Sequence, residues 1–414
     1  MSIPNPERAG RVEWAAIRNQ ARTAFKAAEL PPRWGHAWRY TSPEIFLAPE
    51  GGLAPSTGAR RILPSSPTAG VRLVRFSEAQ GDDALVIQKH LGTATGSRDG
   101  KLEALDLASW QDGVLVRIAP RATPEEPIHL VTEPGDGVFG SVRLLVVAEE
   151  GSMITLIDDY HASSAPPTPL AGETGEVSPL QGGSGSAATP YQLHSTVEII
   201  AGVSACVRYI AIQELPSKTI FLLKQRARAA EDSSVLSSLF SFGGSTARAD
   251  IGTILEGRNA SSRAFGVCVG NNSQHFDHHT VHLHQAPGTR SDFDFRAVLA
   301  GNARSIYTGS IVIEKGAPGC EAFQVNRNLM LSGTARADSI PELEIKNDDV
   351  KCSHGSATGP VEPIQVYYLM ARGLPEAEAV RLVALGFAEQ LFARTPALIG
   401  NRARASLAAT LEKT

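Results

Sequence analysis

Two side chains that could bind a metal ion or an iron–sulfur cluster lie two residues apart near the C-terminal end of the sequence. Cys352 and His354 belong to the segment LEIKNDDVKCSHGSATGP, residues 343–360, which reads as an extended strand. Side chains i and i+2 of a strand point to the same face, so the thiol and the imidazole would face one way. Both groups suit iron, zinc or iron–sulfur chemistry. A metal site usually has about four ligands, so the others would come from elsewhere in the fold or from a second chain.

The same spacing also fits a simpler interpretation, in which a buried cysteine lies beside a hydrogen-bonded histidine at the end of the fold. The spacing of Cys352 and His354 does not decide between the two.

A second candidate metal site is the histidine-rich segment HFDHHTVHLH, which holds five of the eleven histidines within residues 275–284. On a strand, His278, His282 and His284 would share one face and could chelate zinc or iron. Cα atoms four residues apart on a strand are about 13 Å apart, which is long for a single ion. The competing interpretation is that these histidines stack along one face and bond to neighbouring strands.

The remaining cysteines give no second site. Cys206 and Cys268 lie in apolar runs and are predicted to be buried, inert thiols, whereas Cys320, in GAPGCEAF, is predicted to be more exposed. Four scattered cysteines without a CxxC pair favour reduced thiols and a cytoplasmic protein. No apolar run approaches the roughly 20 residues of a membrane span. A net charge of −4 argues against a nucleic-acid binder.

The pattern of apolar and β-branched residues divides the chain into three regions. Residues 1–112 are mixed and helical, residues 113–350 form short β-branched runs, and residues 351–414 have helical spacing. In the middle region, Gly- and Asn-containing turns recur with no amphipathic crossover helices, which favours a β-helix. Residues 162–190 are rich in Pro, Gly, Ser and Thr and are expected to form a flexible surface loop.

A helix is predicted over residues 375–393, with Pro375 in its first turn. Its apolar face includes Val380, Val383, Phe387, Leu391 and Phe392. The sequence has no GxxxxGK[ST] P-loop, no GxGxxG fingerprint, no HExxH and no GxSxG elbow, so no recognisable nucleotide site or hydrolase signature is present.

Three segments together resemble a known family. They are SDFDFRAVLAGNARSIYTGSIVIEKGAPGCEAFQVNRNLMLS, ADSIPELEIKNDDVKCSHGSATG and, near the N-terminus, HAWRYT. They closely resemble the SufB/SufD family of the SUF iron–sulfur cluster assembly system. DDVKCSHG points to the SufD branch, because the SufB branch usually carries a motif like FEHEA there. The tract at residues 162–190 departs from the family pattern and looks like an insertion.

The resemblance implies a mainly β fold: a right-handed parallel β-helix core with α-helical N- and C-terminal domains. It implies a non-enzymatic scaffold subunit that pairs with a SufB-like subunit, with a homodimer possible for the isolated chain. An ABC-type ATPase, SufC, would dock on the C-terminal helices, for which the apolar face of 375–393 is the candidate. A transient cluster or iron would form at the SufB–SufD interface, with His354 as a ligand and Cys352 beside it, and none would be held stably by this chain alone.

Two other functions remain open at this point. The first is a metal-dependent β-helix enzyme, such as a polysaccharide lyase or isomerase, that uses the histidines of 275–284 or strand carboxylates. The second is a purely structural subunit that ligates nothing. In that case truncation of the C-terminal tail would abolish function, whereas replacement of His354 would not.

Overall fold

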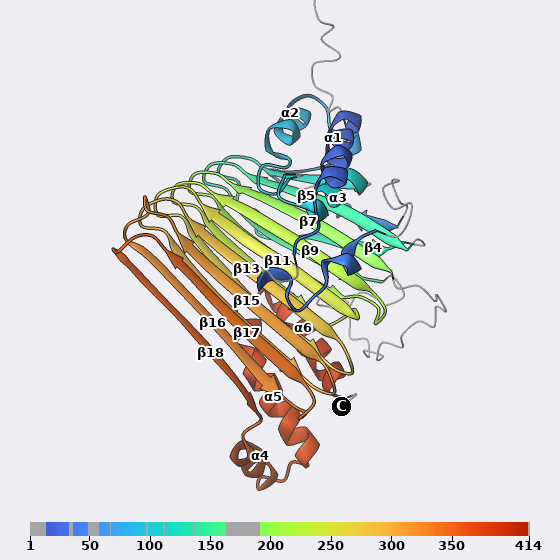
Figure 1. Ribbon diagram of the computed structural model, residues 1–414, viewed down its shortest axis with the longest axis vertical. Helices are drawn as coiled ribbons and strands as arrows, with labels where there is room; N and C mark the ends of the chain where they lie inside the picture. Colours follow the sequence, from blue (N-terminus) through green and yellow to red (C-terminus); the bar gives the residue numbers. More distant parts are fainter. Residues whose placement is uncertain are drawn as a thin grey trace, which may run out of the picture.

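The computed structural model describes residues 14–32, 36–48, 58–66, 68–96, 98–110, 112–135, 138–162 and 191–412. The loop predicted at 162–190 lies outside the described residues, except for its first residue. The described chain is an elongated β-helix with helices at both ends, as predicted (Figure 1).

Two nine-stranded sheets face each other, and the chain passes from one to the other with nearly every strand. From β3 onward, neighbouring strands within each sheet are parallel. The first sheet, sheet A, contains β1 (Ala59–Ile62), β4 (Ile128–Pro134), β6 (Met153–His161), β8 (Cys206–Glu214), β10 (Ser234–Ser241), β12 (Ser261–Gly270), β14 (Arg290–Leu299), β16 (Cys320–Met330) and β18 (Val350–Pro360).

Sheet B alternates with sheet A along the chain, so each coil of the β-helix contributes one strand to each sheet. Its strands are β2 (Val71–Arg75), β3 (Asp112–Ile118), β5 (Phe139–Ala148), β7 (Gln192–Ala201), β9 (Ile220–Ala229), β11 (Thr246–Leu255), β13 (His275–His284), β15 (Arg304–Ile313) and β17 (Arg336–Ile345). The β1 and β2 strands are antiparallel additions at the start of each sheet.

The core lies between the two sheets, because alternate side chains of every strand point inward. Parallel in-register pairing stacks these side chains in columns, so Val207 of β8 lies beside Val235 of β10. The same register continues to the last two coils, where Tyr307 of β15 is inside the core and pairs with Ser339 of β17. One continuous apolar cluster therefore runs along the whole β-helix.

One corner of the β-helix is built from a repeated left-handed turn. The turns from sheet B to sheet A contain Ser204, Asp232, Asn259 and Gly288, with φ values of 56°, 54°, 59° and 69°. The backbone N–H of each donates to a carbonyl in the equivalent turn of the next coil, as from Asn259 to Pro287 at 3.1 Å. Gly, Asn and Asp are the residues that best tolerate this conformation, which explains their recurrence.

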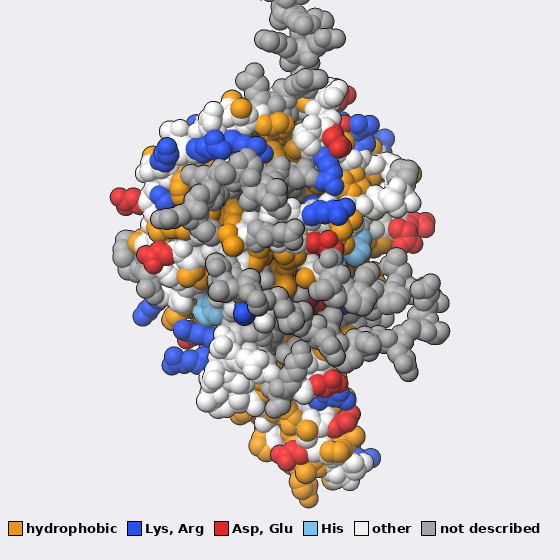
Figure 2. Space-filling view, turned by 90° about the vertical axis from the view of Figure 1, so that its right-hand side faces the viewer, with side chains coloured by type: hydrophobic (Ala, Val, Ile, Leu, Met, Phe, Trp, Pro, Cys, Tyr) orange, Lys and Arg blue, Asp and Glu red, His pale blue; other side chains and the backbone are white. Residues whose placement is uncertain are grey.

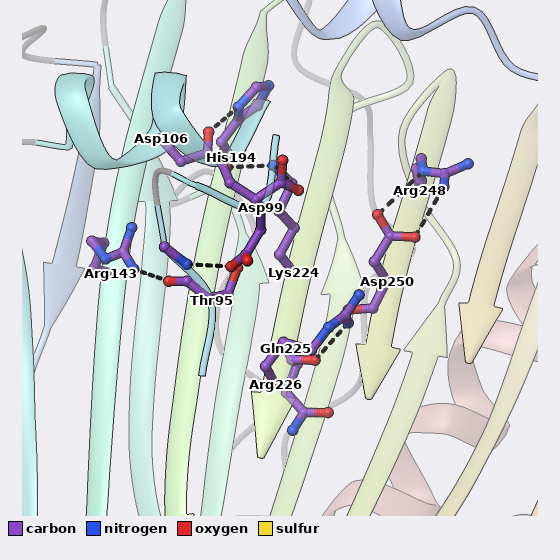
Figure 3. A network of polar contacts seen from close by, with 12 residues as sticks. Thr95, Asp99, Asp106, Arg143, His194, Lys224, Gln225, Arg226, Arg248 and Asp250 are labelled. Carbon is purple, nitrogen blue, oxygen red and sulfur yellow. Dashed lines mark hydrogen bonds and ion pairs between the residues drawn. The ribbon is translucent and has the colours of Figure 1, made fainter. Parts of the chain in front are cut away.

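The N-terminal helices cover the outer face of the first strands of sheet B (Figure 1). They are α1 (Trp14–Ala27), α2 (Gly81–His90) and α3 (Lys101–Ser109), with short 3₁₀ turns η1 (His36–Trp38), η2 (Pro43–Phe46) and η3 (Phe76–Glu78). Beside the apolar contacts, Asp106 of α3 accepts a hydrogen bond from Lys224 of β9 at 3.0 Å and contacts His194 of β7 at 2.6 Å (Figure 3). A buried ionic network thus joins the N-terminal domain to the β-helix.

The HAWRYT segment crosses sheet B further along the chain. The Arg248 guanidinium of β11 lies 3.7 Å from the ring centroid of Trp38 and donates to the carbonyl of Ala37 at 2.9 Å. Thr41 hydrogen-bonds with His275 of β13 at 2.7 Å. These contacts give the motif a structural role: it straps the N-terminal domain across the central coils.

Strand β18 extends to Pro360, so the β-helix continues about ten residues beyond residue 350, where the sequence pattern placed its end. Three helices follow: α4 (Pro363–Met370), α5 (Glu376–Phe392) and α6 (Ala397–Leu411). The α5 and α6 helices pack on the outer face of sheet A, against Phe240 and Phe265. Arg402 of α6 adds ion pairs with Asp159 and Glu214 of the sheet. Within the described residues, no helix has the length and apolarity needed to cross a membrane.

Candidate functional site

Cys352 and His354 lie on β18, the last strand of sheet A. Cys352 pairs with Ala322 of β16 and His354 pairs with Gln324, and both partners are buried. Because the two residues alternate on one strand, they share a face, as the sequence predicted. Among the described strands, β18 pairs only with β16, so its second edge carries unpaired backbone groups.

This face lies at the open end of the core. Cys352 is half-buried and packs against the core cluster, whereas His354 is exposed. On the facing strand β17, Leu343 and Ile345 continue the inward columns of β15, yet they remain 37% and 41% exposed. Within the described chain, no further coil covers these apolar side chains, and the core ends open beside the candidate ligands.

The local environment keeps the thiol protonated. Burial, and then the neighbouring Cys320, raise the pKa of Cys352 above its ordinary value. A metal ion would have to displace the thiol proton, so any ligation by Cys352 would weaken as the pH falls. Beneath His354, the Oε1 atom of Gln324 is buried and has no hydrogen-bond partner among the described residues. The end of the core therefore has an unsatisfied acceptor as well as exposed apolar groups.

The other cysteines differ in part from the sequence prediction. Cys320 is fully buried rather than exposed, because it begins β16 facing inward and its thiol meets Thr289 at 3.0 Å. Cys206 is half-buried rather than buried, because it faces the outer side of sheet A. Cys268 is buried as predicted, and burial raises the pKa of its thiol to about 12.

Three histidines of β13, His278, His282 and His284, share a face as predicted, but that face is the interior of the β-helix. His278 hydrogen-bonds with Ser241 at 3.4 Å and His282 with Ser262 at 2.9 Å. His284 is bonded at both ring nitrogens, to hydroxyls of Thr289 and Ser291. Burial lowers the pKa of His278 and of His284 to about 4.

These contacts favour hydrogen-bonded core histidines over a metal centre at β13. His278, His282 and His284 each find hydroxyl partners on other strands or turns, rather than converging on one point. In the described ranges, no group of three or more His, Cys, Asp or Glu side chains is arranged to hold a metal ion. These three histidines thus contribute to packing of the core.

The predicted docking face on α5 is divided by the fold. Leu391 and Phe392 are fully buried against sheet A and so belong to the chain's own core. Val380, Val383 and Phe387 are half-buried. The latter two line a groove of about 750 Å³ between α4, α5 and the end of sheet A.

The sequence analysis missed the contribution of α4 to this surface. Ile364 and Tyr367 are each 69% exposed and Tyr368 is 56% exposed. Figure 2 shows hydrophobic side chains gathered at the end of the molecule where α4 and the start of α5 protrude. The segment PIQVYYLM, with aromatic and aliphatic residues on every side of a short helix, was the available signal.

Comparison with known proteins agrees with this fold and these motifs. Residues 131–387 match the family model described as SUF system FeS cluster assembly, SufBD core domain. An iron–sulfur cluster assembly SufBD family protein of Mycobacterium tuberculosis is 28% identical over 379 residues, which cover 89% of this chain and 86% of that protein. The iron–sulfur cluster assembly protein SufD of Bacillus subtilis is 30% identical over 290 residues, covering 69% of this chain and 61% of that protein.

The matched region contains most of the β-helix together with β18, α4 and the first part of α5. It therefore includes Cys352, His354 and the α4–α5 groove. The chain belongs to the SufBD family of the SUF iron–sulfur cluster assembly system.

Proposed function

We propose that this chain is a SufD-like scaffold subunit whose open β-helix end meets a SufB-like subunit, with a nascent iron–sulfur cluster assembled between them. The observation that carries this proposal is the position of Cys352 and His354. A pair of metal-binding side chains lies on the terminal strand, which has one unpaired edge in the described chain, at an end of the core that the described chain leaves uncovered.

The form of this end suits a protein partner. Strands β17 and β18 are ten and eleven residues long, and each has one edge without a strand neighbour in the described chain. Long unpaired edges are templates for pairing with another chain. The half-exposed Leu343 and Ile345 add apolar area that a partner would bury. A second β-helix of the same family would supply both strand edges and a matching core.

The ligand count supports an interfacial cluster. Cys352 offers one thiolate after losing its proton, and His354 offers one neutral imidazole nitrogen. Two donors leave the coordination of iron incomplete, so the other ligands and the sulfide would come from the partner and from the cargo itself. The cluster would thus be cargo: it would be assembled between the two chains and then transferred to another protein.

The α4–α5 groove is the proposed docking site for the ABC-type ATPase SufC. Its wall includes Ile364, Tyr368, Val383 and Phe387, and the neighbouring Tyr367 is exposed. Docking energy at such grooves comes mainly from buried aromatic and aliphatic anchors. Because Leu391 and Phe392 hold the other side of α5 on sheet A, movement of a docked ATPase would be transmitted to the β-helix.

The test is replacement of His354 by alanine in cells that depend on this assembly system. Ser356→Ala is the matched control, because Ser356 is an exposed residue on the same face of the same strand. We expect His354→Ala to lower the activity of iron–sulfur enzymes while Ser356→Ala leaves it unchanged. Equal cluster maturation in the two strains would refute the ligand role.

A structural subunit without ligands is the second candidate, favoured by the long unpaired edges alone. Deletion of α5 and α6, compared with His354→Ala, separates the two candidates, because deletion removes the docking surface needed under both, whereas His354→Ala removes only a ligand. If deletion abolishes maturation while His354→Ala does not, the structural role is the correct one.

A further inference from the structure

A second depression lies on the outer face of sheet A, away from the open end. It has a volume of about 420 Å³, a size typical of small-ligand sites. Residues from β8, β10, β12 and β14 line it, and the C-terminal helical domain contributes Arg394 at its rim. Strand β16 lies between it and β18, so it is separate from the Cys352–His354 pair.

The register places two arginines in one column on the floor of this depression. Arg208 of β8 and Arg263 of β12 flank Leu236 of β10. With strands about 4.8 Å apart, their Cα atoms are about 9.6 Å apart, so two guanidinium groups can close on one anionic group from both sides. Both arginines are exposed, and neither makes a hydrogen bond or a salt bridge with a described side chain.

The next position in the same column is an acid. Asp292 of β14 follows Arg263, and it has no salt bridge in the described chain. Burial, and then the neighbouring Asp294, raise the pKa of Asp292. Asp294 itself is already paired with Arg296 and lies 3.7 Å from Arg394.

The depression therefore has two unlike ends. At one end are unpaired guanidinium groups, with the hydroxyl groups of Ser234 and Ser261 beside them. At the other is a carboxyl group that can accept a hydrogen bond, and the apolar surface of Leu236 and Phe265 joins the two. Arg394 stacks over Phe265 at 6.0 Å and closes the side toward the helices.

We propose that this depression binds a small organic phosphate, with the phosphate between Arg208 and Arg263 and a hydrogen-bond donor of the organic part at Asp292. The planar guanidinium groups can each donate two hydrogen bonds to phosphate oxygens. An inorganic anion would have no donor for Asp292 and would be repelled by its carboxylate, whereas an organic phosphate can offer a donor there. The position of Arg394, in the link between α5 and α6, connects the site to the C-terminal helices.

The test uses ADP and inorganic pyrophosphate as probes in calorimetric titrations of the full chain. We expect ADP to bind with one site and more tightly than pyrophosphate. Arg208→Gln and Arg263→Gln should each weaken ADP about tenfold or more, because each removes charge-assisted hydrogen bonds. Arg228→Gln is the matched control, since Arg228 is a partly exposed arginine on sheet B.

Asp292→Asn should change the affinities for the two probes in opposite directions, which a general change of charge would not do. The substitution should tighten pyrophosphate, because it removes a repelling carboxylate, and should weaken ADP, because it replaces a charged acceptor by the weaker carbonyl acceptor of an amide. Cys206 supplies an independent readout, since it lines the depression and is half-buried. ADP should slow alkylation of Cys206 and leave alkylation of Cys352 unchanged.

Several results would overturn the proposal. They are the absence of saturable ADP binding, equal affinity for ADP and pyrophosphate, and unchanged affinity in both arginine variants. Equal protection of Cys206 and Cys352 would do the same. The substituted arginines are exposed, so these variants are expected to fold.

Discussion

At the scale of single residues, the chemistry of a side chain in this protein depends on which side of the β-helix wall it occupies. His354 and His284 are both on strands of a repeating coil, but one is exposed at the open end and the other is enclosed and bonded at both ring nitrogens. The exposed imidazole of His354 is accessible to a metal ion, whereas the enclosed imidazole of His284 is neutral and hydrogen-bonded within the core. The residue type alone carries neither role.

The enclosed histidines predict how stability depends on pH. Burial lowers the pKa of His284 to about 4, below its value of about 6.5 in an unfolded chain. The unfolded state therefore binds the proton first as the pH falls, and stability is lost from about pH 6.5 downward to about pH 4. Within that window, each such histidine lowers the free energy of unfolding by about 1.4 kcal/mol for each pH unit that the pH falls. Urea denaturation of wild type and His284→Gln at pH 7, 6 and 5 measures the slopes.

The variant should lose less stability than wild type between pH 7 and pH 5, although it starts less stable. Parallel loss in the two proteins would show that His284 does not carry this dependence. Between pH 7 and pH 8 both curves should be nearly level with respect to this histidine, which serves as an internal control.

At the scale of elements, the repeated left-handed turn sets the register of the coils. Asn259 has φ of 59° and also donates from its side chain to Asp232 of the preceding coil. Asn259→Val should destabilise the protein, because a β-branched residue costs roughly 1–2 kcal/mol in this conformation. Asn259→Gly, which keeps the backbone conformation, should change stability by much less. Urea midpoints of the two variants decide, and a valine variant as stable as the glycine variant would contradict this role of the turn.

The sequence was sufficient to predict the elements that repeat. The recurring β-branched runs and Gly- or Asn-containing turns indicated a β-helix, and the spacing after Pro375 indicated α5. It was insufficient where burial depends on what covers an outer face. Leu391 and Phe392 read as a docking face, and only the packing of α5 on sheet A shows that they are core residues. The prediction that Cys320 is exposed was wrong for a related reason. Strand β16 begins at Cys320 itself, so the side chain faces the core.

At the scale of the whole molecule, the two ends of the β-helix are unequal. N-terminal helices and the HAWRYT segment cover the early and central coils, whereas the last coil, within the described residues, has two strand edges without a neighbour and uncovered apolar side chains. The family resemblance predicted His354 as a ligand at a subunit interface without indicating which strand edges form it, and nothing in the local sequence of β17 marked Leu343 and Ile345 as exposed. Their exposure follows from being the last coil, a property of the chain's overall topology.

This asymmetry predicts a variant that folds but does not assemble. Ile345→Lys places a charge on the open end, where it should weaken partner binding at least tenfold because an unpaired charge would be buried at the interface. Leu85→Lys is the matched control, since Leu85 is an exposed apolar residue on α2. Both variants should keep near-native unfolding midpoints. Equal recovery of the partner with the two variants would place the interface elsewhere.

The most direct test of the central claim is anaerobic purification of this chain together with the SufB-like subunit and the ABC ATPase of the same cell, followed by determination of iron and sulfide per complex. We expect a complex in which wild type carries iron and sulfide, while His354→Ala assembles equally well and carries much less of both. A complex whose iron and sulfide are unchanged by His354→Ala, or a chain that purifies without a SufB-like partner, would contradict the account.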